Sequence, residues 1–71
     1  MLNISIVGFG RFGKTLFRLI KDDFDIILYD TNKNAFIGLP KKDQIKVTDN
    51  LGVVFSGDVI FYCVPINKYL N

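Results

Sequence analysis

Three closely spaced glycines, Gly8, Gly10 and Gly13, sharply limit how this 71-residue chain can fold. The residues before them, 2–7 (LNISIV), alternate and then become fully apolar, which predicts a strand buried on both faces. The residues after them, 11 to about 21, carry apolar side chains at helical spacing. A chain that passes from a buried strand over glycines into a helix predicts the first half of a strand–helix–strand unit.

The predicted helix has two distinct faces. Four apolar residues at positions i, i+4, i+7 and i+8 form the stripe that we expect to face the core: Phe12, Leu16, Leu19 and Ile20. Three basic residues form the opposite face, which we expect to be solvated: Lys14, Arg18 and Lys21. The helix is therefore expected to lie along one side of a sheet.

A second predicted strand follows at 24–29 (FDIILY) and ends at Asp30. Strand, helix and strand within about 30 residues form a βαβ unit, whose strands pair in parallel through a right-handed crossover. The segment 31–44 has no sustained helical stripe and predicts a loop or a vestigial helix. The remaining elements are predicted as a short strand at 45–47, a short helix at 49–55, a strand at 58–64 and a helix start at 67–71.

The octapeptide GFGRFGKT, residues 8–15, satisfies two phosphate-binding patterns. Its glycines spell G-x-G-x-x-G, the dinucleotide-binding motif, while the whole stretch also spells G-x-x-x-x-G-K-T, the P-loop of nucleoside triphosphatases. Both patterns use backbone N–H groups at a helix N-terminus to face phosphate oxygens. The intervening residues and the rest of the chain must decide between them.

Two aromatic residues and one acid favour the dinucleotide motif. A P-loop wraps around a phosphate and favours small or polar residues, whereas this loop contains Phe9 and Phe12. Phe12 begins the apolar stripe, so we expect it to point into the core. Asp30 ends the second strand 22 residues after Gly8, where a dinucleotide site needs an acid for the adenosine ribose hydroxyls. A chain of 71 residues also leaves no room for a triphosphatase core.

Motif and elements together predict an α/β fold. We expect a truncated Rossmann-type parallel sheet of about four strands in the order 3-2-1-4, with one main helix and one short helix. Residues 1–71 would form one partial dinucleotide-binding domain. Residues of the loop, the first helical turn and the end of the second strand are expected to contact the dinucleotide: Gly8, Phe9, Gly10, Arg11, Phe12, Gly13, Asp30 and Thr31.

The predicted cofactor is NAD, because Asp30 would repel the 2′-phosphate of NADP. NADP remains the alternative, since Lys33 could meet such a phosphate or could simply be a solvated lysine. Arg11 either contacts the pyrophosphate or projects into solvent. The motif thus predicts a dinucleotide cofactor and leaves open whether its adenosine ribose carries a 2′-phosphate.

Composition excludes several other classes of function. The net charge is only +2 and the basic residues are scattered, so we expect no nucleic-acid partner. The longest apolar runs, such as 59–65, are too short to cross a bilayer, so we expect no membrane association. The chain has no His or Glu, and Cys63 lies in an apolar run, so we expect no metal site and no catalytic residue. A single cysteine and the lack of a signal peptide predict the cytoplasm.

Three segments, ISIVGFGRFG at the start, LYD at the second strand and DVIFYCVPI at 58–66, resemble the prephenate and arogenate dehydrogenases of tyrosine biosynthesis. The resemblance implies the NAD(P)-binding portion of such an oxidoreductase, with Val64 and Pro65 near the nicotinamide half or its ribose. That family takes its catalytic His and substrate-binding Arg from further along the chain, so we expect these residues alone to be inactive. GFGRFG is also similar to the non-catalytic dinucleotide-sensing domains of potassium channels and transporters, which form the alternative.

The predicted strand order has a consequence for assembly. It places the strand 58–64 at an edge of the sheet, and no central charge or proline there discourages pairing with another strand. We therefore expect a homo-oligomer formed through this strand, or pairing with the missing C-terminal part of a parent enzyme.

Overall fold

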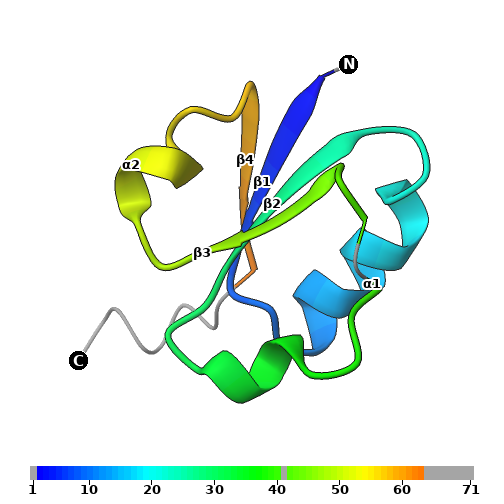
Figure 1. Ribbon diagram of the computed structural model, residues 1–71, viewed down its shortest axis with the longest axis vertical. Coiled ribbons are helices and arrows are strands. Elements are labelled where there is room, and N and C mark those ends of the chain that lie inside the picture. The colour runs from blue at the N-terminus through cyan, green and yellow to red at the C-terminus, as the bar shows by residue number, and fades with distance from the viewer. Residues whose placement is uncertain (1, 41, 64–71) are drawn as a thin grey trace.

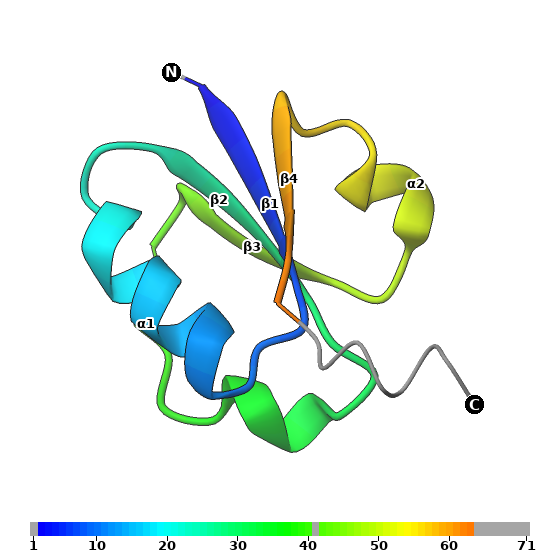
Figure 2. The same cartoon turned by 180° about the vertical axis from the view of Figure 1, so that it is seen from behind.

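The computed structural model describes residues 2–40 and 42–63. Its elements in chain order are β1 (Asn3–Val7), α1 (Arg11–Ile20), β2 (Asp25–Tyr29), the 3-10 helix η1 (Lys33–Phe36), β3 (Ile45–Thr48), α2 (Leu51–Val54) and β4 (Val59–Tyr62). The four strands form one parallel sheet in the order β3-β2-β1-β4, which confirms the predicted fold class and strand order. Figure 1 and the view from behind in Figure 2 place α1 and α2 on opposite sides of this sheet.

The side of the sheet that faces α1 holds the main core. Ile4 and Ile6 of β1 lie beside Ile26 and Leu28 of β2 in the parallel register. All four are at most 5% exposed, and Phe17 of α1 packs with them. Because β1 is central and covered on both faces, four of its five residues are buried, as its apolar sequence predicts.

The opposite side of the sheet packs against α2 through a polar contact. The Ser5 hydroxyl, completely buried on β1, donates a hydrogen bond of 2.7 Å to the carbonyl oxygen of Val54 in α2. Gly57 lies against the same serine, and a Cβ at this position would overlap the Ser5 side chain. The short helix is therefore held to the sheet by this buried hydrogen bond and by the completely buried Val54 side chain, and Gly57 permits the close approach.

The buried face of α1 differs from the predicted stripe. Phe12 and Leu19 are 80% and 73% exposed, so the expectation that Phe12 points into the core is wrong. Gly13 and Phe17 are buried instead, and Leu16 and Ile20 are half-buried against the core. The physical reason lies at Gly13, where a Cβ would overlap the carbonyl oxygen of Gly8. This close contact turns the Gly13 side of the helix toward the sheet and moves Phe12 outward.

The connection between β2 and β3 contains a short helix, η1, where the sequence predicted either a loop or a vestigial helix. The Asn32 side chain caps η1 by accepting a hydrogen bond of 3.0 Å from the Asn34 N–H. Gly38 adopts a positive φ of 85°, and Pro40 follows, so the helix ends after one turn. This segment therefore covers the β2–β3 side of the sheet with a single turn and a loop.

The later elements agree with the sequence within their described parts. The third strand and the short helix are present, and β4 occupies the middle of the predicted strand 58–64. The predicted helix start at 67–71 lies outside the described residues. Within residues 2–40 and 42–63, no helix has the length and apolar character needed to cross a membrane.

Candidate functional site

The glycine loop connects the carboxyl end of β1 to the start of α1. The Gly8 N–H donates a hydrogen bond of 2.7 Å to the carbonyl oxygen of Tyr29, at the end of β2. Gly8 has a positive φ of 92°, a conformation that disfavours any residue with a Cβ. The turn out of β1 is therefore fixed by the backbone of the neighbouring strand and requires glycine at its first position.

The other two glycines of the motif have opposite surroundings. Gly13 is buried against the Gly8 carbonyl, so the helix can approach the loop only without a side chain there. Gly10 is exposed, and a Cβ built on it would meet no atom within 4 Å. Packing explains Gly13, whereas nothing in the fold requires the absence of a side chain at Gly10.

The N-terminus of α1 presents free hydrogen-bond donors beside Gly10. The first helical hydrogen bond runs from the Lys14 N–H to the Gly10 carbonyl oxygen at 2.9 Å. The N–H groups of Arg11, Phe12 and Gly13 precede it and have no acceptor within the helix. The helix has no side-chain cap and no acidic residue in its first turn. Its partial positive charge is therefore available to an anion.

Asp30 links the end of β2 to the glycine loop. Its Oδ2 accepts a hydrogen bond of 2.7 Å from the Phe9 N–H, and its Oδ1 accepts one of 2.8 Å from the Asn32 N–H. Sequence reasoning placed the carboxylate near the cofactor but missed this contact with the loop, because the spacing of residues does not reveal which N–H lies opposite. Each carboxylate oxygen retains acceptor capacity for a further donor, such as a ribose hydroxyl.

A cavity of about 360 Å³ adjoins Asp30 at the carboxyl ends of β2 and β3. Open α/β sheets bind their ligands at this edge. Besides Asp30, it is lined by residues of η1 and of the end of β3: Lys33, Phe36, Val47, Thr48 and Asp49. Sequence reasoning did not single out the last three residues, although their place at and just after the end of the third predicted strand was a usable signal.

Phe9 fills the role in the core that the sequence assigned to Phe12. Its side chain is 2% exposed. The ring packs edge-on against Phe17 and stacks on Phe36 of η1, with both centroid distances 5.6 Å. The Phe9 N–H is bound by Asp30, so neither the side chain nor this N–H faces the open space at Gly10. Phe9 therefore anchors the loop, while Phe12 stands exposed in the first helical turn.

Of the other residues predicted to contact a cofactor, the structure describes two and leaves two outside the described residues. Arg11 and Thr31 are exposed, at the start of α1 and directly after Asp30. Val64 and Pro65 lie outside the described residues. Cys63, just before them, donates its N–H to the Val7 carbonyl oxygen at 2.7 Å and packs against the core.

Cys63 lies beside the end of β1, through the hydrogen bond from its N–H to the Val7 carbonyl oxygen. Burial raises the pKa of the Cys63 thiol, which keeps it protonated and weakly nucleophilic near neutral pH. Among the described residues, no three His, Cys, Asp or Glu side chains gather in a way that could hold a metal ion. The arrangement provides donors for a phosphate and an acceptor for a hydroxyl group, which is chemistry for binding.

Comparisons of the chain with protein-family models, with curated proteins and with solved structures gave no match.

Proposed function

We propose that this chain binds a dinucleotide, with NAD preferred to NADP, through the glycine loop and Asp30. The open space at Gly10, at the uncapped N-terminus of α1, is the observation that supports this proposal best. A pyrophosphate approaching there would meet backbone N–H groups and the positive end of the helix. In this proposal Asp30, which accepts a hydrogen bond from the adjacent loop residue, also accepts hydrogen bonds from the adenosine ribose.

The preference for NAD follows from the charges around the ribose position. The cavity beside Asp30 contains two carboxylates, Asp30 and Asp49, against one lysine, Lys33. A 2′-phosphate would be repelled by both acids, whereas the hydroxyl group of NAD can donate to one of them. The excess of negative charge therefore favours the cofactor without the phosphate.

The resemblance to prephenate and arogenate dehydrogenases suggests the context of this binding. We propose that the chain corresponds to the NAD-binding portion of such an oxidoreductase, and that alone it does not catalyse the reaction. The lack of any histidine in the sequence supports this second point. The alternative is a dinucleotide-sensing regulatory domain, which would bind the dinucleotide through the same loop and catalyse no reaction.

The exposed edge of the sheet supports a proposal about partners. Val59, Phe61 and Tyr62 of β4 are 38%, 40% and 64% exposed, and β4 ends the strand order. We propose that this edge pairs with a second copy of the chain or with the remaining part of a parent enzyme. We also propose the cytoplasm as the compartment, because a single cysteine cannot form a disulfide within the chain.

The proposed function is tested by titrating the chain with NAD, NADP, ADP and ATP in a calorimeter. We expect NAD to bind more tightly than NADP, and Asp30→Asn to weaken NAD binding roughly tenfold, because the charged acceptor of a ribose hydroxyl is lost. Asp23→Asn, the same change at an exposed aspartate after α1, is the matched control and should leave the affinity unchanged.

Two outcomes would contradict the assignment. Unchanged NAD affinity in Asp30→Asn, with a native circular-dichroism spectrum, would remove Asp30 from the site. Tight, Mg²⁺-dependent binding of ATP without binding of NAD would mean that the loop acts as a P-loop.

A further inference from the structure

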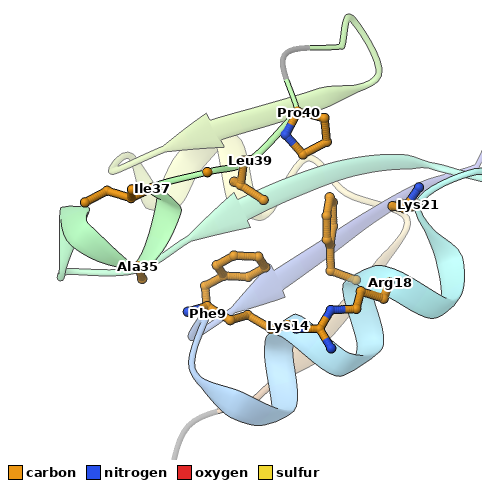
Figure 3. A pocket seen from close by; sticks show the side chains of 10 residues that line it. Phe9, Lys14, Arg18, Lys21, Ala35, Ile37, Leu39 and Pro40 are labelled. Atoms are coloured by element: carbon orange, nitrogen blue, oxygen red, sulfur yellow. The ribbon is translucent and has the colours of Figure 1, made fainter.

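A second cavity, here called the α1–η1 cavity, shares no lining residue with the cavity beside Asp30. It has a volume of about 360 Å³ and opens between α1 and the segment 35–40 (Figure 3). Phe9 separates the two places, because its backbone belongs to the glycine loop while its ring lines this cavity. The cavity exists because only one helical turn and a loop connect β2 to β3.

The floor of the α1–η1 cavity is apolar and rigid. Phe9 and Phe17 line it while being only 2% and 4% exposed, and their rings stand at 80° to each other. Leu39 and Pro40 form the opposite wall (Figure 3). Aromatic rings packed in the core present fixed faces and edges, which suit a flat apolar ligand better than a flexible chain.

One rim of the cavity is positively charged. Lys14, Arg18 and Lys21 follow one another along the same flank of α1 and all line the cavity (Figure 3). Within residues 2–40 and 42–63, the ion pairs join Asp22 to Lys21 and to Lys42, so Lys14 and Arg18 have no acidic partner. The Lys14 ammonium group instead lies 5.8 Å from the centroid of the Phe9 ring.

The charge of this rim contrasts with that of the cavity beside Asp30. No aspartate of the described chain lines the α1–η1 cavity, whereas two line the other. An anionic group here would meet the guanidinium of Arg18 and the ammonium group of Lys14, whereas Lys21 is already paired with Asp22. A guanidinium can bind a carboxylate through two parallel hydrogen bonds. An apolar floor with a few charged groups at one side is typical of sites for small ligands, and this volume lies in their range.

We propose that the α1–η1 cavity binds a small organic anion with a flat, ring-shaped apolar body, of the class of aromatic carboxylates. The ring lies between Leu39, Pro40 and α1, over the floor that Phe9 and Phe17 form. The carboxylate lies at the rim beside Arg18 and Lys14. This site goes beyond the proposed dinucleotide site and does not depend on it, because the two share no side chain.

The proposal is tested by nuclear magnetic resonance with 2-naphthoate as the probe. In the ¹⁵N-labelled chain we expect the largest shifts at the amides of residues 14–21 and 35–39. 2-Naphthamide, the uncharged analogue of 2-naphthoate, should bind at least roughly tenfold more weakly, because it lacks the carboxylate that pairs with Arg18. Arg18→Glu should weaken the binding of 2-naphthoate to a similar extent.

Two further variants control the experiment. Lys46→Glu makes the same reversal of charge at an exposed lysine of β3 that does not line the cavity, and it should leave the affinity unchanged. Lys14→Glu repeats the test at a second exposed rim residue, in case Arg18→Glu does not give a native spectrum.

Equal binding of 2-naphthamide, unchanged affinity in both rim variants, or shifts confined to residues outside the cavity would overturn the proposal. An NAD titration on the same samples separates the two sites. If NAD fails to bind while 2-naphthoate binds with this charge dependence, only the proposed function is contradicted.

Discussion

Gly10 and Gly13 both lack a side chain, but for different physical reasons. At Gly13 a Cβ would overlap the Gly8 carbonyl, so the residue is required by the packing of α1 on the loop. At Gly10 the backbone has a negative φ of −83° and a Cβ would meet nothing, so the fold would accept a side chain. These two positions can therefore separate a requirement of the fold from a requirement of the ligand.

Substitutions at these glycines should have opposite effects on stability and binding. Gly10→Ser supplies a favoured helix cap, so we expect the free energy of unfolding to stay equal or rise by roughly a few tenths of a kcal/mol. Its side chain would occupy the space where the pyrophosphate approaches, and NAD affinity should fall at least roughly tenfold. Gly13→Ala should lower the free energy of unfolding by about 1–3 kcal/mol or more, because the helix must move.

Urea denaturation and calorimetric titration of NAD measure both effects. A Gly10→Ser chain that binds NAD as tightly as the original would show that the ligand does not approach this glycine. A Gly13→Ala chain with unchanged stability would contradict the close contact between α1 and the Gly8 carbonyl.

At the level of secondary-structure elements, α1 is the element whose orientation matters most. Its two phenylalanines lie five positions apart and differ in burial, since the side chain of Phe17 is 4% exposed and that of Phe12 is 80% exposed. The helix itself follows from local periodicity, but its rotation about its axis is set by the contact between Gly13 and Gly8. This rotation also brings Lys14, Arg18 and Lys21 to the rim of the α1–η1 cavity.

Alanine substitutions at the two phenylalanines test this rotation. Phe17→Ala should lower the free energy of unfolding by about 3–5 kcal/mol, because it leaves a cavity in the core. In a domain this small, such a loss approaches the whole stability. Phe12→Ala should change it by less than about 0.5 kcal/mol. Urea denaturation gives both values, and a larger loss at Phe12 than at Phe17 would support the stripe predicted from the sequence.

At the level of the whole molecule, the two edges of the sheet are not equivalent. The edge strand β3 carries the exposed charge of Lys46, whereas β4 is uncharged and exposes apolar side chains. A charge on an edge strand opposes pairing with another chain, and an apolar edge favours it. Association of copies is therefore expected at β4.

A lysine on each edge tests where copies associate. We expect the original chain to have a dimeric mass by light scattering at micromolar concentration, and Phe61→Lys to shift it to the monomer. Val47→Lys places the same charge on β3, at a similarly exposed position, and should leave the dimer intact. A monomeric mass of the original chain at every concentration would contradict self-association.

The sequence by itself determined the elements and their order. Alternation and apolar runs predicted β1, β2 and β4, helical spacing predicted α1, and the doubly wound arrangement of Rossmann-type folds predicted the order β3-β2-β1-β4. The elements are local features, and the order follows from the fold type that the glycine motif indicates, so no knowledge of distant contacts was needed. The positions of the glycines and of Asp30 within these elements were predictable for the same reason.

Only the tertiary structure decided which side chains meet. It buried Phe9 in place of Phe12, joined Asp30 to the Phe9 N–H, and left two cavities of opposite charge on either side of η1. Each of these outcomes depends on contacts between residues far apart in the chain, such as 9 with 30 and 36. Periodicity gives the face of a helix only to within about one residue, whereas a single close contact between glycine backbones fixes its rotation.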